Sequence, residues 1–202
     1  AGMKANHPWL KQMAKLGFLL MMGVSMSAEA GFFGLGGNEK WKEEVQLSDR
    51  QIIVIEREQI NEGGGDEWAF NRSGTKPKEF RIRFEYPKGL RKEVEWKSTK
   101  KSPRTWPEVP LVFDVVASQP IVFTLVAISP ACEIYSKYIY RDGLWVEEPL
   151  PDQFEPRPTN LFFGNRKGMP SLLDLVEKDK RNSGSGYRPA LKQVGPNKKV
   201  CG

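Results

Sequence analysis

Residues 80–86 read FRIRFEY, and this short stretch decides the fold class of the chain. Its four apolar residues alternate strictly with three charged ones, so the hydrophobic period is two. Successive side chains of a β-strand point to opposite faces, so Phe80, Ile82 and Phe84 would face a core while the charges face water. The stretch therefore predicts a half-buried strand, as found in antiparallel sheets with one solvated face.

Segments on both sides of this stretch also read as strands. Residues 41–47 place most of their apolar side chains on one side, and residues 52–55 are a β-branched run typical of a strand. The pair Asp142-Gly143 is a dipeptide that two-residue hairpin turns favour. The segments that read as strands are 41–47, 52–55, 80–86, 94–96, 111–116, 121–128, 134–140 and 144–146.

These segments make about eight strands in consecutive hairpins, with no crossover helix between them. We therefore expect a mainly β fold, either an antiparallel sandwich or a partly open barrel. Polar loops are expected at 63–78 and 98–110. Residues 171–178 follow Pro170 and predict one C-terminal helix with Ser171 as its N-cap.

The first 30 residues have the layout of a secretory signal peptide. Residues 1 and 2 precede the first methionine and look like a cloning scar, and three lysines then precede an apolar run over 16–26. Ala28 and Ala30 put small residues at the two positions that a signal peptidase inspects. Cleavage after Ala30 would start the mature chain at Gly31 and place it in the periplasm or outside the cell.

Two other interpretations of the leader stay open. Its apolar core of about ten residues is too short for a bilayer of roughly 30 Å, which takes about 20 residues. Extending the core to Leu35 would bury Glu29, at a cost of several kcal/mol. An uncleaved leader would anchor the protein in the inner membrane, and a buried core helix is the third interpretation. Membrane contact is expected only if the leader is retained.

Export to an oxidising compartment would favour a disulfide bond between the two cysteines. Cys132 and Cys201 are the only pair in the chain, and an oxidising compartment favours a disulfide between them. The bridge would close a loop of about 70 residues and stabilise the fold by roughly 4 kcal/mol. Two free thiols, one buried and one at a frayed terminus, are the alternative.

The chain divides into parts that differ in charge. In order, we expect a cloning scar and signal peptide (1–30), a Gly-rich linker (31–40), an antiparallel β domain (41–148), and a Pro-rich strip with a short helix and a basic tail (149–202). The net charge of +6 is the sum of +2 in 1–30, −2 in 31–163 and +6 in 164–202. Because the positive charge lies at the ends, no nucleic-acid partner is expected for the folded body.

Catalytic motifs are missing from the sequence. The only histidine, His7, lies in the leader, so the mature chain would lack Ser-His-Asp and Cys-His catalysis and histidine-ligated metals. Ser98 and Lys101 match the S-x-x-K signature, but that chemistry needs a helix, and here a strand runs into a loop. No phosphate-binding or dinucleotide-binding loop is present. We therefore expect no catalytic residue, no metal site and no cofactor.

Paired carboxylates would be the remaining route to catalysis, as in glycan hydrolases. The acids that come into question are Glu43, Glu44, Glu147, Glu148 and Asp152. Adjacent acids on a strand point to opposite faces, so no facing pair is evident.

Aromatic and arginine residues in the loops are the candidates for partner binding. Trp68 and Arg72 lie in one predicted loop, and Arg104 and Trp106 lie in the other. Recognition surfaces are rich in these residue types, and the partner would be an envelope protein or a glycan. Core packing accounts for most of the aromatic set, which consists of Trp68, Trp106, Tyr135, Tyr138, Tyr140 and Trp145.

A series of segments resembles a set of uncharacterised exported, periplasmic proteins of proteobacteria. The segments are WKEEVQLSD (41–49), IIVIERE (52–58), EVEWK (93–97), PLVFDVVASQPIVF (110–123) and CEIYSKY (132–138). Members of that set commonly have Asp-Gly where this chain has Asp49-Arg50, so the first turn departs from their pattern. The resemblance implies an exported envelope protein and supplies no catalytic residue.

The sequence as a whole favours an exported, non-catalytic protein with a binding, accessory or structural role in the periplasm. One alternative is a subunit of a membrane-associated envelope complex, anchored by an uncleaved N-terminal helix. A second is a carboxylate-dependent hydrolase of cell-wall glycan.

Overall fold

The computed structural model describes residues 37–63, 75–86, 92–102, 106–129, 132–151, 153–164, 166–184, 191–195 and 198–199. All of them belong to one compact unit, Gly34–Gly202. The fold is mainly β, with two five-stranded sheets, which confirms the predicted fold class in its sandwich form. Among the described residues, no helix has the length and apolar character needed to span a bilayer.

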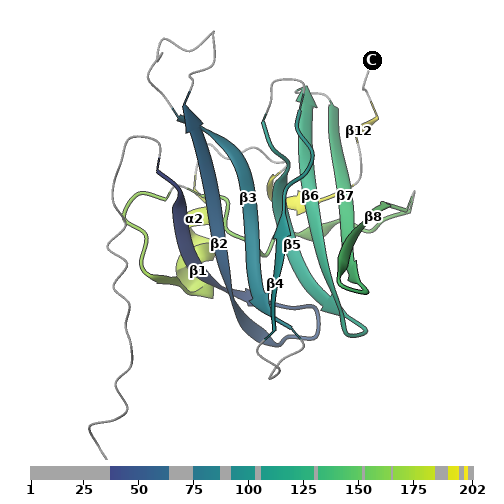
Figure 1. Ribbon diagram of the computed structural model, residues 1–202, viewed down its shortest axis with the longest axis horizontal. Helices are drawn as coiled ribbons and strands as arrows, with labels where there is room; N and C mark the ends of the chain where they lie inside the picture. The colour runs from purple at the N-terminus through teal and green to yellow at the C-terminus, as the bar shows by residue number, and fades with distance from the viewer. Residues whose placement is uncertain are drawn as a thin grey trace, which may run out of the picture. The chain divides into compact units, whose positions relative to one another are not determined.

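The first sheet is an antiparallel meander with one short parallel strand at its edge. Its strand order is β10-β1-β2-β3-β4, and β1 to β4 lie side by side in Figure 1. The strands are β1 (Glu39–Gln46), β2 (Ile52–Gly63), β3 (Thr75–Glu85), β4 (Glu93–Lys97) and β10 (Leu172–Leu173). The predicted strand at 80–86 is the second half of β3, and β3 pairs with both of its neighbours.

The second sheet is also an antiparallel meander, in which β6 and β7 are central. Its order is β12-β7-β6-β5, and β8 pairs with β7 (Figure 1). The strands are β5 (Val109–Val116), β6 (Gln119–Ser129), β7 (Cys132–Arg141), β8 (Leu144–Pro149) and β12 (Lys198–Lys199). The chain crosses between the sheets from β4 to β5, whereas β1 to β4 and β5 to β8 pair in sequence order.

The main core lies between the two sheets and follows the predicted alternation. Phe80, Ile82 and Phe84 are buried, as FRIRFEY predicts. The ring of Phe84 contacts the ring of Phe113 from β5, with centroids 4.6 Å apart. Burial of a side chain of this size contributes about 1.5–3 kcal/mol, so alternation on β3 is a strong determinant of the sandwich.

A second apolar cluster explains why β5 and β6 read as continuous apolar runs. Phe123, Leu125 and Tyr135 are buried in this cluster, which is separate from the main core. Leu150 and Phe154 from the Pro-rich strip pack against it. The strip ends in β9 (Arg157–Pro158), which pairs with β11 (Gln193–Val194). Strands β5 to β7 of the second sheet are therefore buried on both faces.

A buried ion pair ties the first sheet to the C-terminal segment. Arg57 Nη1 donates to Glu43 Oε1 at 2.7 Å, and both side chains are almost fully buried. The other carboxylate oxygen of Glu43 accepts the backbone N–H of Phe162 at 2.9 Å. Burial lowers the pKa of Arg57, and the neighbouring Glu43 carboxylate opposes that effect. Losing one partner of such a pair would leave an uncompensated buried charge, so Glu43 is held in place by Arg57. The held carboxylate in turn binds the segment that carries Phe162.

The C-terminal helix is present but starts later than the sequence indicates. It is α2 (Leu175–Asn182), and its N-cap is Asp174, whose side chain accepts the N–H of Glu177, so the expectation of Ser171 as cap is wrong. Residues 172–173 instead form β10, which pairs in parallel with β1, and Leu173 is fully buried. Tertiary burial of Leu173 thus overrides its helix propensity.

Three further boundaries differ from the sequence expectations. The predicted linker 31–40 overlaps β1, which begins at Glu39. Of the predicted loop 63–78, residues 75–78 belong to β3, and residues 109–110 of the second predicted loop belong to β5. In each case the neighbouring strand continues the pairing: Glu39 pairs with Gln59, Thr75 with Gly63 and Val109 with Leu125.

The first turn of the first sheet forms in spite of its sequence. Arg50 has a φ of 69°, and its N–H donates to Leu47 O at 2.9 Å. An L-residue pays roughly 1–2 kcal/mol in this left-handed region, which glycine enters freely. The Asp-Gly dipeptide of the resembling proteins would fit this turn better than Asp49-Arg50 does.

We predict that Arg50→Gly raises the free energy of unfolding by about 0.5–1 kcal/mol, because it relieves the left-handed strain at a small cost in chain entropy. Urea denaturation followed by tryptophan fluorescence measures the effect. Arg50→Ala is the control, since it removes the same side chain but keeps the Cβ atom. Equal stability of the two variants would show that the backbone at residue 50 is unstrained.

Candidate functional site

The outer face of the first sheet is the candidate site, because it is the sheet face that presents exposed side chains in ordered rows. The residues of β1 to β4 that point away from the core include Lys40, Lys42, Val54, Glu85 and Glu93, and all five are exposed. In the second sheet, β5 to β7 are covered by apolar clusters on both faces, and the exposed apolar residues Leu144 and Val146 lie on β8. The rows on the first sheet fall into a charged half and an apolar half.

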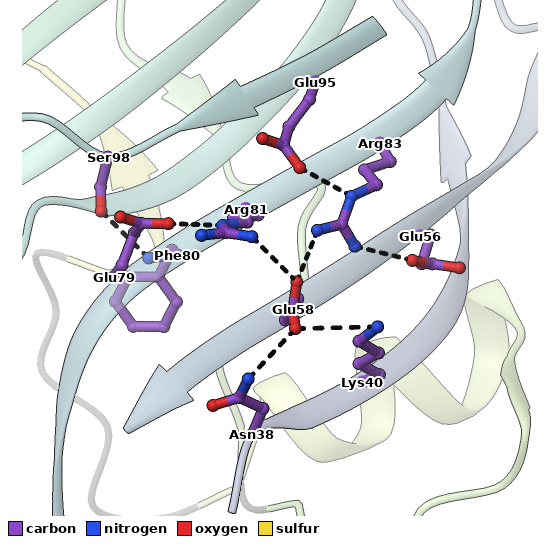
Figure 2. Close-up of polar contacts among 10 residues, drawn as sticks. All are labelled: Asn38, Lys40, Glu56, Glu58, Glu79, Phe80, Arg81, Arg83, Glu95 and Ser98. Atoms are coloured by element: carbon purple, nitrogen blue, oxygen red, sulfur yellow. Dashed lines mark hydrogen bonds and ion pairs between the residues drawn. The ribbon is translucent and has the colours of Figure 1, made fainter. Parts of the chain in front are cut away.

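Arg83 is the centre of the charged half, which Figure 2 shows. Its guanidinium bonds three carboxylates: Glu58 at 2.6 Å, Glu95 at 2.7 Å and Glu56 at 2.9 Å. These acids come from the strands on either side of β3. Partial burial acts to lower the pKa of Arg83, but the three hydrogen bonds outweigh it and raise that pKa. Arg83 thus clamps β2, β3 and β4 together at one row.

Glu58 extends the charged half towards β1. Its carboxylate lies 3.8 Å from Lys40 Nζ and 3.8 Å from Arg81 Nη1, and Asn38 Nδ2 donates to it at 3.5 Å (Figure 2). The side chain of Glu58 is only 4% exposed although it lies on the outer face. Arg81 also donates to Glu79, and this hydrogen bond raises the pKa of Arg81. The name charged lattice is used below for Lys40, Glu56, Glu58, Glu79, Arg81, Arg83 and Glu95.

Directly next to the charged lattice, strands β2 and β3 part. Their pairing runs as far as Glu56↔Arg83, although β2 continues to Ile52 and β3 to Glu85. In the same register Val54 would stand opposite Glu85, but the two are not paired. The name split is used below for this opening between Ile52–Val54 of β2 and Glu85 of β3.

The ladder between β2 and β3 ends before it reaches the backbone groups of Val54 and Glu85. Leu47 N donates to Gln51 O, so the alternating pattern of an antiparallel ladder turns the N–H and C=O of Val54 away from β1 and towards β3. Tyr86 N donates to Lys92 O, so the same rule turns the N–H and C=O of Glu85 away from β4 and towards β2. The two sets of backbone groups face each other across the split.

A hollow of about 650 Å³ opens at the split. Ile52 and Val54 supply its outer apolar surface, with 52% and 50% of their area exposed. Through the split the hollow also reaches core side chains such as Ile55 and Phe84. Its lining residues are Lys42, Leu47, Asp49, Gln51, Ile52, Ile53, Val54, Ile55, Glu56, Arg83, Phe84, Glu85, Tyr86, Glu93, Val115 and Ser118.

The rim of the hollow is acidic. Glu85 and Glu93 stand directly opposite each other on β3 and β4, and like charges in that arrangement destabilise a sheet. Within the described part of the chain, neither carboxylate takes part in an ion pair or a side-chain hydrogen bond. Asp49 adds a third carboxylate, which accepts two hydrogen bonds from Gln51. Among the described residues, no group of three or more His, Cys, Asp and Glu side chains is arranged to hold a metal ion.

Only one of the four predicted partner-binding residues can be placed. Trp106 is 43% exposed, and its backbone N–H donates to Ser102 Oγ at 3.2 Å. Two residues further on, Glu108 is a fully buried carboxylate that accepts hydrogen bonds from Thr124 and Tyr138. Arg104, Trp68 and Arg72 lie outside the described residues, so a common site of the four stays a prediction.

The residues predicted for export and bridging are only partly described. Ala28, Ala30 and Gly31 lie outside the described residues, and so does Cys201. Cys132 is buried at the start of β7. Strand β12 places Lys199 opposite Cys132, two residues before Cys201. The bridge therefore remains a prediction.

Four of the five carboxylates considered for hydrolysis bind other groups of the chain. Glu43 binds Arg57, and Glu44, on the opposite face of β1, accepts the N–H of Leu175 at 3.2 Å. Glu147 pairs with Lys100, Glu148 pairs with Lys137 and Arg141, and Asp152 lies outside the described residues. Ser98 Oγ accepts the N–H of Phe80, and Lys101 lies in a bridge to Pro107, so the S-x-x-K match does not lie on a helix.

The aromatic set behaves as expected for core packing. Tyr135 and Tyr138 are buried, and Tyr140 and Trp145 are partly buried and pack against the main core. Burial raises the pKa of Tyr135 to about 12, with a smaller contribution from the charge of Glu133.

Sequence reasoning missed the residues that make the hollow. Ile52 and Val54 were part of a predicted strand, but the unbroken run 52–55 does not say that one face of it stays exposed. Glu85 and Glu93 lie equally far in sequence from Gly89, on either side of it. This spacing in a predicted hairpin could have indicated that the two acids stand opposite each other. The parting of β2 and β3 has no local signature, because it depends on register.

Comparisons with known proteins add no family to this description. No protein-family model matches the chain, and neither a curated protein nor a solved structure shows significant similarity to it.

We predict that Arg83→Met lowers the free energy of unfolding by about 2–3 kcal/mol, because it leaves the nearly buried carboxylate of Glu58 without its closest partner. Arg81→Met is the matched control. Its guanidinium is more exposed, with 30% against 16% of the side chain accessible, so a loss of about 0.5–1 kcal/mol is expected. Chemical denaturation measures both values, and equal losses would contradict the central role of Arg83.

Proposed function

We propose that this chain is an exported, non-catalytic binding protein of the bacterial envelope, and that its partner binds at the hollow on the outer face of the first sheet. One observation carries the proposal: Ile52 and Val54 are half exposed beside open backbone groups of Val54 and Glu85. Exposed apolar side chains that gather in a hollow with polar groups around them are characteristic of interaction sites.

The surroundings of the hollow support a binding role. The charged lattice holds β2, β3 and β4 in fixed register directly beside the split, so the site would need little ordering when a partner arrives. In the second sheet, the side chains of β5 to β7 are buried in two apolar clusters, one on each face. Little of the binding free energy would therefore be lost to ordering the site.

The export part of the proposal rests on the leader and on the cysteines. Residues 4–30 have the order of a signal peptide, and an oxidising compartment would allow the bridge between Cys132 and Cys201. An anchored subunit of an envelope complex would present the same hollow, so it differs from the main proposal only in whether the leader is retained.

The proposal predicts two results for protein recovered from the periplasmic fraction of an expressing bacterium. Its intact mass should correspond to a chain that begins at Gly31 and lacks the two thiol hydrogens of Cys132 and Cys201. After cross-linking in the native envelope, the wild-type protein should capture a defined partner. The variant Ile52→Lys/Val54→Lys should capture at least tenfold less of it, since it puts two charges into the apolar part of the hollow.

The matched control is Leu144→Lys/Val146→Lys on β8. These residues form an equally exposed apolar pair, 69% and 42% accessible, on the other sheet. The control should capture as much partner as the wild type, and circular dichroism should show that both variants are folded. Equal loss of capture in both variants would contradict a site at the hollow, and a retained leader would favour the anchored subunit.

A further inference from the structure

We propose that the split between β2 and β3 receives an extended polypeptide segment of a partner protein, in which Lys or Arg side chains alternate with small aliphatic ones. This inference rests on the proposed binding function and names the chemistry of the partner. Three independent features of the hollow carry it: its backbone groups, its charge and its apolar surface.

The backbone groups point to a polypeptide. Val54 and Glu85 each present an N–H and a C=O to the split, where the ladder between their strands has ended. Backbone donors and acceptors in regular alternation are complementary to another extended chain, which is how strands add to an open ladder. Because unpaired backbone groups carry a free-energy penalty once water is excluded, an apolar ligand without such groups would bind less well here.

The charge points to a cationic segment. The hollow is lined by four acids, Asp49, Glu56, Glu85 and Glu93, and by two basic residues, Lys42 and Arg83. Glu56 and Arg83 bind each other within the charged lattice, which leaves three acids against one base. A cation placed between Glu85 and Glu93 would also relieve their mutual repulsion, so the attraction is larger than that of one carboxylate.

The apolar surface points to aliphatic side chains between the cations. Ile52 and Val54 lie on the outer face of β2, and Val54 lies in the same row as Glu85 and Glu93. Side chains of an extended segment alternate between two faces, so in the split those on the outer face can meet the acids, while those on the other face point towards the apolar lining residues Ile55 and Phe84. A volume of about 650 Å³ is in the range of peptide and ligand sites, and it has room for a few side chains.

The probe for this inference is a fluorescent heptapeptide of alternating lysine and valine, titrated with the mature protein in 50 mM salt. We expect saturable binding, and we expect Glu85→Gln/Glu93→Gln to weaken it about fivefold to tenfold. The control Glu155→Gln/Asp179→Asn removes the same two charges from exposed positions elsewhere and should change the affinity by less than twofold. Raising the salt to 500 mM should weaken binding to the wild type more than binding to Glu85→Gln/Glu93→Gln.

Several outcomes would overturn the inference. These are no binding of the lysine–valine peptide to the wild type, or equal weakening by both double variants. Preferential binding of a glutamate–valine peptide or of an N-acetylglucosamine tetramer would assign the hollow to a different partner class. A concentration-dependent dimer in sedimentation that Glu85→Gln/Glu93→Gln abolishes would assign it to a second copy of this chain. Circular dichroism of the variants excludes misfolding as the cause of any loss.

The failure of this inference is distinguishable from the failure of the proposed function. If Ile52→Lys/Val54→Lys loses an envelope partner while the lysine–valine peptide does not bind, the site stands and its partner has another chemistry. If the peptide binds in the expected way but no envelope partner depends on Ile52 and Val54, the chemistry of the hollow stands and the envelope function fails.

Discussion

The hydrogen bonds of Arg83 to three carboxylates fix the row at which the first sheet changes character. From this row towards the Gly63 end of β2, β2 to β4 are joined by both backbone pairing and charged side chains. Towards the Ile52 end, β2 and β3 part, while β3 and β4 stay paired with Glu85 opposite Glu93. A guanidinium forms hydrogen bonds in a planar fork, so it can hold several carboxylates at set distances in a way that a lysine cannot. The hollow exists where this clamp ends, and its position is therefore as well defined as that of the clamp.

The two sheets divide the work of the fold. In the second sheet β5 to β7 are buried on both faces and contribute mainly stability, while the exposed apolar residues Leu144 and Val146 lie on β8. The first sheet buries one face, and the buried pair Glu43–Arg57 attaches the C-terminal segment along β1. A buried ion pair is weak evidence for stability by itself, but it penalises any arrangement that leaves one charge alone. In the described part of the chain, the outer side chains beside the split thus stay exposed, on a scaffold that the packed elements support.

The sequence predicted the strands well because their signal is local. Alternation at Phe80–Tyr86 and continuous apolar runs in β5 and β6 report directly on how many faces of a strand are buried. The helix start was missed because burial of Leu173 against Trp41 and Phe162 is a tertiary event. The hollow was missed for a similar reason, since it depends on where pairing between Val54 and Glu85 stops. The sequence instead predicted partner binding at the loop aromatics Trp68 and Trp106, and of these two only Trp106 lies in the described residues.

Hydrogen exchange of four backbone amides, followed by NMR, tests the central claim most directly. The amides of Glu56 and Arg83 are bonded across the β2–β3 ladder, whereas those of Val54 and Glu85 face the split. We expect strong protection of the first two amides and exchange of the last two at close to the rate of an unfolded chain. Protection of all four amides in the free protein would show that β2 and β3 pair to their ends, and that the hollow does not exist.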